Sequence, residues 1–178
     1  FTAAGQPDSA FGANGNGTVR INTTEHDEAR DIVLMSDGRL LVVGERDVPG
    51  VPGAVFELWL ARLLANGQLD TSFGSGGVAT LATPMRGYAV AVQADGIVWA
   101  AGETPSANGS SADLGLARFT AAGQPDASFG NGGLLAVDLF GGLDTPGAML
   151  LQPDGRLVIA GRADNGSTIG LGLVRVTP

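Results

Sequence analysis

Three aspartates stand in front of similar glycine-rich stretches and are the first candidates for chemistry in this chain. Asp8, Asp70 and Asp126 open the segments Asp-Ser-Ala-Phe-Gly, Asp-Thr-Ser-Phe-Gly and Asp-Ala-Ser-Phe-Gly. A loop carboxylate can serve as a general acid or base, or as a metal ligand. An aspartate just before a turn, however, more often accepts hydrogen bonds from the backbone N–H groups ahead of it. We therefore predict a structural role for these aspartates and for those of the three Asp-Gly pairs, Asp37, Asp95 and Asp154.

His26 is the only histidine, so any Ser-His-Asp triad or multi-histidine metal site would have to include it. The neighbouring Glu25, Asp27 and Glu28 could hold a calcium ion weakly, but their spacing matches no calcium loop. Residues 162–167 resemble a calcium loop only faintly, and no Gly-x-Ser-x-Gly elbow occurs. We predict a surface loop around His26. We also predict that the chain is not an enzyme and has no catalytic, cofactor-binding or metal-binding residue.

Two further patterns have both a chemical and a structural interpretation. The glycine cluster at 73–77 could cradle a phosphate, but it lacks the following Lys and the helix, and it occurs three times. A repeated turn is the better interpretation. Trp59 and Trp99 lie in apolar runs and do not recur at equivalent positions, which predicts core packing rather than a repeated sugar platform.

Arg62, Arg118 and Arg175 present a different problem, because strand alternation puts each on the same face as two leucines. A partly buried arginine needs a partner. We predict that each arginine pairs with an aspartate of an Asp-x-Ser-Phe-Gly turn and fixes the crossing between repeats. A ring of anion-binding arginines on a central axis is the functional alternative.

All these residues recur because the chain is built from repeats. The stretch FTAAGQPD occurs at 1–8 and again at 119–126. The Asp-x-Ser-Phe-Gly, Asp-Gly and Leu-Ala-Arg markers keep one order, with a period near 59 residues. Missing such a repeat would misassign the whole fold. We divide the chain into three units, at about 1–62, 63–118 and 119–178, which form a single repeat domain over 1–178.

Each unit contains four short apolar runs and no sustained helical period, so the fold is predicted to be all-β with almost no helix. An Asp-Gly pair joins the second and third runs, which is a strong hairpin signal. The predicted first strands are 18–22, 78–82 and 134–139, and the second strands are 29–35, 88–93 and 148–152. The third strands are 39–44, 97–102 and 156–161, and the fourth strands are 56–63, 114–119 and 170–176.

Four antiparallel strands repeated about every 59 residues predict a β-propeller with three four-stranded blades. Propellers usually close with about four to eight blades, so three blades form a partial or half propeller that needs other blades to close. The sequence begins and stops at the same phase of the repeat. The chain is therefore expected to be cut from a longer array, to complete a six-bladed ring as two copies, or to add head to tail into a fibre.

The composition excludes two classes of partner. The net charge is −8, there is no Lys, and the ten arginines are spread singly, so no nucleic-acid surface is expected. No run approaches the 18–20 apolar residues that a membrane span requires, so no membrane insertion is expected. The absence of Cys leaves the compartment undecided. The start at Phe1, without a basic and apolar leader, fits a removed signal peptide or an excised piece.

The third unit carries the repeat markers most fully, as Asp126-Ala-Ser-Phe-Gly-Asn-Gly-Gly133, Gln152-Pro-Asp-Gly-Arg156 and Ile159-Ala-Gly161. Over essentially the whole chain, these markers resemble the bacterial delta-60 repeat family. The resemblance implies propeller-like arrays in large secreted or cell-surface bacterial proteins, with no shared enzymatic activity. The first unit departs from the family pattern at Ala10 and Ser36 and carries an insert at 46–54.

Function is expected where the units differ, because repeats share a framework and vary their loops. The connections at 45–55, 103–113 and 162–169 differ most and share one rim by repeat symmetry. We predict a scaffold or a protein- or glycan-binding module of a surface or secreted protein, with any ligand on that rim. A structural subunit that assembles head to tail is the alternative, and a lectin-like sugar binder or a hydrolase is less favoured.

Overall fold

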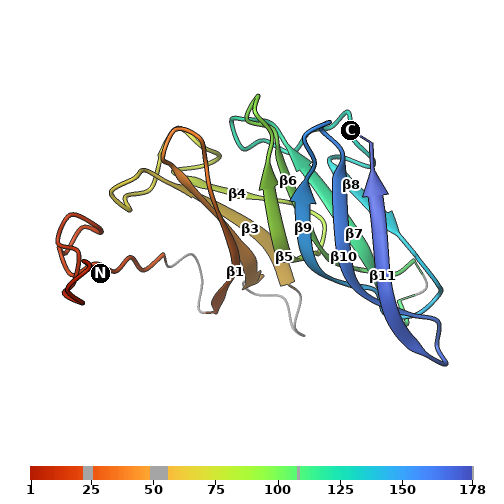
Figure 1. The fold of residues 1–178 in the computed structure, drawn as a ribbon. Helices are drawn as coiled ribbons and strands as arrows, with labels where there is room; N and C mark the ends of the chain where they lie inside the picture. Colours follow the sequence, from red (N-terminus) through yellow and green to blue (C-terminus); the bar gives the residue numbers. More distant parts are fainter. Residues whose placement is uncertain (22–25, 49–55, 108, 178) are drawn as a thin grey trace.

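The computed structural model describes residues 1–21, 26–48, 56–107 and 109–177, and every regular element in these ranges is a β-strand (Figure 1). The strands are β1 (Asp27–Leu34), β2 (Leu40–Asp47), β3 (Phe56–Leu63), β4 (Val78–Thr80), β5 (Arg86–Val92), β6 (Val98–Pro105), β7 (Ala112–Phe119), β8 (Leu134–Val137), β9 (Thr145–Leu151), β10 (Leu157–Asp164) and β11 (Ile169–Val176). The predicted all-β class is confirmed. Among the described residues no helix is long and apolar enough to cross a membrane.

The strands form three separate antiparallel sheets, none of them closed on itself. The first sheet has the order β1-β2-β3-β4, the second β5-β6-β7-β8 and the third β9-β10-β11. The sheets stand one behind the other along the chain (Figure 1), as blades of a propeller do. The prediction of three antiparallel blades is confirmed, but the third blade has three described strands instead of four.

The missing strand follows from how the sheets are assembled. β4 comes from the second sequence unit, yet it pairs with β3 of the first unit, with Ala61 opposite Val78. β8 pairs with β7 in the same way. Each complete sheet therefore takes its fourth strand from the unit that follows it. Residues 18–21 occupy the position of β4 in the repeat, but no strand equivalent to β3 precedes them in the described chain, so the strand predicted at 18–22 does not form there. Asn22 lies outside the described residues.

The Asp-Gly hairpins form as predicted at all three positions. Gly38, Gly96 and Gly155 each have a φ between 84° and 88°, a conformation that glycine adopts without strain. In each turn the preceding aspartate accepts a hydrogen bond from the backbone N–H two residues ahead, at 3.1 Å. The structural role predicted for Asp37, Asp95 and Asp154 is therefore confirmed.

Strand alternation divides the apolar side chains between two cores. Val98 and Ala100 of β6 face a core between the first and second sheets, together with Leu58 and Leu60 of β3. Trp99 and Ala101, which alternate with them, face a second core between the second and third sheets. The middle sheet is thus buried on both faces, and the predicted core role of Trp99 is confirmed.

A bulge shapes the inner edge of every sheet. β1, β5 and β9 each carry one extra residue against the neighbouring strand, namely Arg30, Tyr88 and Gly147. Opposite the bulge the second strand of each sheet has a glycine: Gly44, Gly102 and Gly161. A Cβ on any of them would overlap the backbone of the bulged strand, which for Gly102 means the carbonyl of Arg86. The Ala-Gly strand endings of the repeat are therefore explained by close approach of two backbones.

Replacing Gly102 with alanine is expected to lower the free energy of unfolding by about 1–3 kcal/mol, because the bulged strand must move to admit the methyl group. The measurement is urea unfolding followed by circular dichroism. Gly147→Ala is the control, since the nearest atom to its Cβ would be the Ala160 carbonyl oxygen at 3.7 Å, an ordinary contact. Equal stabilities for the two variants would contradict this explanation.

Candidate functional site

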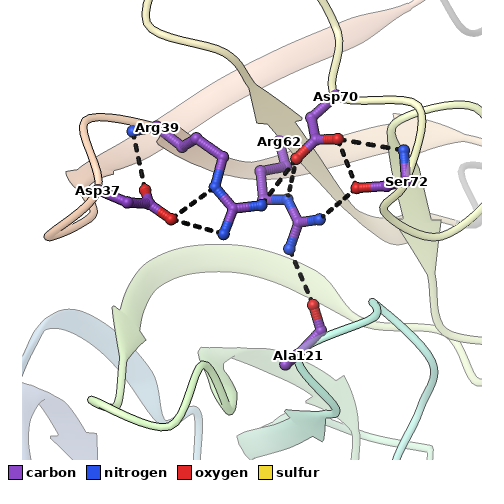
Figure 2. A network of polar contacts seen from close by, with 6 residues as sticks. All are labelled: Asp37, Arg39, Arg62, Asp70, Ser72 and Ala121. Carbon is purple, nitrogen blue, oxygen red and sulfur yellow. Dashed lines mark hydrogen bonds and ion pairs between the residues drawn. The ribbon is translucent and has the colours of Figure 1, made fainter.

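The most extensive polar cluster of the described residues surrounds the ion pair of Arg62 and Asp70 (Figure 2). Arg62 comes from β3 and Asp70 from the turn that follows it. Arg62 Nε donates to Asp70 Oδ2 at 2.8 Å. The two side chains are only 7% and 9% exposed. Ser72 Oγ and the Ser72 backbone N–H both donate to Asp70 Oδ1, at 2.6 Å and 3.1 Å. The serine and aspartate of the marker therefore complete one buried, hydrogen-bonded ion pair.

The cluster also joins two sheets. Arg62 NH1 donates to the carbonyl oxygen of Ala121 at 2.8 Å, in the loop that follows β7 of the second sheet. On its other side Arg39 NH1 reaches Asp70 Oδ2 at 2.8 Å, and Arg39 Nε is held by Asp37 at 2.8 Å. Figure 2 shows these contacts running from Asp37 and Arg39, at the β1–β2 hairpin, through Asp70 and Arg62 to the Ala121 carbonyl. The arrangement fixes the crossing between neighbouring sheets.

These contacts set the ionisation of the turn aspartates. The pKa of Asp70 lies well below its ordinary value, chiefly because Ser72 and then Arg39 hydrogen-bond its ionised form, against the opposing effect of burial. The pKa of Asp126 is also lowered, first by Ser128. A lowered pKa means that each carboxylate stabilises the fold above its ordinary pKa and loses this contribution as the pH falls.

The arrangement is repeated once more. Arg118 Nε donates to Asp126 Oδ2 at 2.8 Å, and Ser128 Oγ donates to Asp126 Oδ1 at 2.6 Å. The Arg118 guanidinium lies 4.9 Å from the ring centre of Phe129, which packs edge-on against Trp99 with ring centres 5.0 Å apart. The predicted pairing of arginine with the turn aspartate is therefore confirmed for Arg62 and Arg118.

The prediction is wrong for Arg175. This side chain is exposed, and no carboxylate among the described residues pairs with it. The alternative of an arginine ring on a central axis also fails. A ring on the central axis would have to form on the strands at which neighbouring sheets meet, and these strands are β1, β5 and β9. The arginines lie on β3, β7 and β11 instead.

The phenylalanine of the turn marker forms the apolar half of the same junction. Phe73 is fully buried, and its ring lies against Gly123 of the next loop, where an added Cβ would come within 2.8 Å of the ring. Beside it, Gly74 N donates to the Ala122 carbonyl at 2.8 Å. Gly12 N donates to Asn66 at the same distance one unit earlier. The glycine cluster 73–77 is thus a repeated turn, as predicted, and we call it the docking turn because it lies against the next loop.

The remaining sequence candidates do not come together. Asp8 accepts a hydrogen bond from Ala10 N at 3.0 Å, as predicted for a turn aspartate. His26 is exposed, and its backbone carbonyl accepts from Asp47 N at 3.2 Å. Glu25 lies outside the described residues. In the 162–167 stretch the Asp164 carboxylate is bound to Arg162 and to Gly166 N. No group of three or more metal-ligating side chains suited to an ion is found in the described part of the chain.

A second polar network lies along the inner edge of the sheets and was not foreseen from the sequence. Glu45 is buried and accepts from Arg30 at 2.9 Å, with Arg86 Nε 3.6 Å away. Glu103, its equivalent in the second sheet, accepts from Tyr88 at 3.2 Å and from Thr145 of the third sheet at 2.5 Å. The network links all three sheets. Its only sequence signal is glutamate after glycine at two equivalent strand ends.

A hollow of about 350 Å³ lies beside this network, on the rim predicted to bind partners. Its wall includes Arg86 and Glu103, and also Ser111 from the connection 103–113. The Arg86 guanidinium stacks on the ring of Phe56 at 3.7 Å. Charged, hydroxyl and aromatic groups thus converge at one place between the first and second sheets. The rest of the lining is mostly apolar, and a mostly apolar hollow with a few polar groups suits a small ligand.

Asp113, close to the same rim, is a buried carboxylate that forms no ion pair with any described residue. At the equivalent position in the first sheet, Glu57 accepts hydrogen bonds from Arg46 on the neighbouring strand, at 2.8 Å and 3.0 Å. In the second sheet the residue opposite Asp113 is Thr104, which carries no charge. Burial raises the pKa of Asp113, and the charges of Asp138 and Asp144 add to the effect. Its contribution to stability is complete below its ordinary pKa of 3.8 and is lost as the pH rises through the raised value.

Asp113→Asn is therefore expected to stabilise the protein at pH 7 by about 1 kcal/mol and to have little effect below pH 3.8. Urea unfolding at both pH values measures the difference. The control is Glu57→Gln, which breaks the ion pair with Arg46 and should act in the opposite direction at pH 7. Destabilisation of Asp113→Asn at pH 7 would refute the interpretation.

The sequence model of one protein family matches three segments of the chain. The family is described as a domain of unknown function (DUF5122) with a beta-propeller fold, and the matched segments are residues 36–73, 93–129 and 152–178. They cover more than half of the chain. Each of the first two segments begins just before an Asp-Gly hairpin and ends at the phenylalanine of a docking turn. No curated protein matches the chain.

Proposed function

The chain belongs to the DUF5122 beta-propeller family, and from this premise we propose that it is a non-enzymatic scaffold and interaction module of a bacterial surface or secreted protein. The resemblance of its markers to the delta-60 repeats supports the proposed location. Its partners are other propeller blades and a protein or glycan ligand held on one rim. Nucleic acid and membrane insertion play no part in the proposed function.

One observation carries this proposal: the side chains that repeat are used to hold the sheets together. Arg62 and Arg118 are paired with turn aspartates, and Phe73 is buried under the next loop. The rim is where the units differ, and the hollow next to Arg86 lies on it. A repeat protein that presents a binding surface is expected to keep a constant framework and to vary the loops of one rim.

The rival functions are supported less well. A lectin would repeat an aromatic and polar site in every blade, whereas Trp59 and Trp99 are buried at non-equivalent positions. A hydrolase would need an acid–base pair, and His26 is the only histidine.

The proposal is tested on intact cells of the source bacterium. Brief protease treatment, followed by mass spectrometry, should release peptides from the connections 103–113 and 162–169 before any cytoplasmic protein is cleaved. The purified chain should turn over none of a panel of chromogenic glycoside, ester and phosphate substrates. Release only after lysis, or a turnover that His26→Ala abolishes, would overturn the proposal.

A second candidate function is that of a structural subunit that assembles head to tail. The observation that favours it is the pair of exposed apolar faces at the two ends of the stack of sheets. Ile32 and Leu34 of the first sheet are exposed, as are Leu171 and Leu173 of the third. Exposed apolar areas of this kind mark contact surfaces.

A further inference from the structure

We propose that the hollow between the first and second sheets binds an arginine side chain of a partner protein, whose guanidinium pairs with Asp113 as Arg46 pairs with Glu57. The inference rests on the proposed function and deepens it, because it gives the chemistry of the partner and the place on the rim where the partner binds. The site lies at the second sheet, which has a described sheet on either side of it.

The first sheet shows how this fold satisfies a carboxylate at the rim. Arg46, near the end of β2, lies opposite Glu57, near the start of β3. Arg46 Nε and NH2 donate to the same oxygen of Glu57, at 3.0 Å and 2.8 Å. The two side chains are 20% and 17% exposed. A guanidinium on the neighbouring strand thus neutralises a largely buried carboxylate with two charge-assisted hydrogen bonds.

The second sheet keeps the carboxylate but has no cation opposite it. Thr104 lies opposite Asp113, at the position that Arg46 holds in the first sheet. Asp113 is only 8% exposed, and no described residue donates a hydrogen bond to its carboxylate or forms an ion pair with it. Burying a charge without such partners costs stability. A cation bound beside Asp113 would complete the pair that the first sheet makes by itself.

The hollow opens beside the shorter side chain. Its lining includes Thr104 and Ala112, and Asp113 follows Ala112 along β7. Residues opposite each other on neighbouring strands have their side chains on the same face, so Asp113 stands next to Thr104 at the edge of the hollow. A volume of about 350 Å³ is at the small end of the range for ligand sites and suits one long side chain. Threonine at this position therefore both omits a cation and leaves space for one.

The walls of the hollow suit the stem of an arginine. The apolar part of the lining consists of Phe56, Pro84, Met85, Pro105 and Ala112. Arginine buries its methylene stem along surfaces of this kind while its charged end reaches a polar partner. Its guanidinium is planar and offers several N–H donors, which matches the two-donor contact in the first sheet better than the ammonium group of a lysine.

The charges around the hollow also favour a cation. Arg86 lies in the lining, but a glutamate of the first sheet opposes its charge from 3.6 Å away. Glu103, also in the lining, accepts hydrogen bonds from two hydroxyl groups and forms no ion pair with a described residue. Asp138 and Asp144 are close enough for their charges to act on Asp113. Together with the net charge of −8, this arrangement draws a basic partner toward the rim.

The test compares two capped pentapeptides that differ in one group. The first is Ala-Gly-Arg-Gly-Ala, and the second has citrulline, which has the same length but no charge, in place of the arginine. Each is titrated into the isotope-labelled chain and followed by NMR. The arginine peptide should shift the amide signals of Thr104 and Ala112 until they saturate, and the citrulline peptide should bind at least about tenfold more weakly. Equal binding of the two peptides would overturn the proposal.

Two variants of the chain test the part played by Asp113. Asp113→Asn removes the charge, and Thr104→Arg supplies an internal cation that fills the hollow. Asp113→Asn should melt no lower than the unmodified chain, and both variants should weaken binding of the arginine peptide about tenfold or more. Asp95→Asn is the matched control, because Asp95 lies in the hairpin at the other end of β6, and it should bind as the unmodified chain does. Full binding by Asp113→Asn would refute the assigned ion pair.

Propylguanidinium separates a protein partner from a free small ligand, because it carries the guanidinium on a short stem without a peptide backbone. Binding of the arginine peptide supports a protein partner. Binding of propylguanidinium but not of the peptide would overturn the assignment to a protein. The proposed location on the cell surface is judged separately, by protease treatment of cells, so a failure of either proposal can be told from a failure of the other.

Discussion

Phe73→Ala is expected to lower the free energy of unfolding by about 3–5 kcal/mol, the usual cost of removing a buried aromatic ring. The ring is fully buried and packs on the backbone of Gly123, which has no side chain of its own to fill the cavity. The Arg62 guanidinium lies 4.5 Å from the centre of the Phe73 ring, so the substitution also removes a cation–π contact. Urea unfolding followed by tryptophan fluorescence measures the loss.

Phe140→Ala is the control for this substitution, because that phenylalanine is largely exposed. Its stability should stay within about 0.5 kcal/mol of the unmodified chain. If Phe73→Ala were equally harmless, the docking turn would not hold the first two sheets together.

Arg62→Ala is expected to cost about 3–5 kcal/mol at pH 7, because it takes from the buried carboxylate of Asp70 one of the two cations that lie 2.8 Å from it. Because Arg39 still pairs with Asp70 in this variant, we expect the loss of unfolding free energy to lie near the lower end of that range. Removing the guanidinium also breaks the hydrogen bond to Ala121, the polar link to the second sheet. Chemical unfolding of dilute samples measures the cost.

The matched control is Arg175→Ala, which removes the same residue type from the same strand position in the third sheet. Its guanidinium is exposed and unpaired among the described residues, so the change should stay within about 0.5 kcal/mol. The pH dependence separates charge from packing. Since the pKa of Asp70 is lowered, the ion pair stabilises above the ordinary value of 3.8 and its contribution fades in acid. The difference between Arg62→Ala and the unmodified chain should therefore shrink as the pH falls.

The sequence predicted those features that depend on neighbours along the chain. The Asp-Gly turns followed from the backbone conformation of Gly38 and its equivalents. The pairing of Arg62 with Asp70 followed from strand alternation and from the need of a half-buried cation for a carboxylate. Both residues lie within one strand and its following turn, where spacing in the sequence limits distance in space.

The features that were missed depend on how separate units pack. The pairing of β4 with β3 requires the register across a unit boundary, which a repeat pattern alone does not give. The network of Glu45, Arg86 and Glu103 likewise joins residues from different sheets. Arg175 is exposed and no described carboxylate pairs with it, so of the three equivalent arginines Arg62 and Arg118 pair as predicted.

Because each sheet takes its last strand from the following unit, the array has no natural seam at which it could be divided. Deleting or duplicating one full period, whatever residue the cut starts from, again joins a strand of the β3 kind to one of the β4 kind. Unequal recombination between neighbouring repeats can therefore change the length of the protein without leaving half a blade behind. Because the same stagger recurs at every unit boundary, the loss or gain of one full period would leave each remaining internal junction intact.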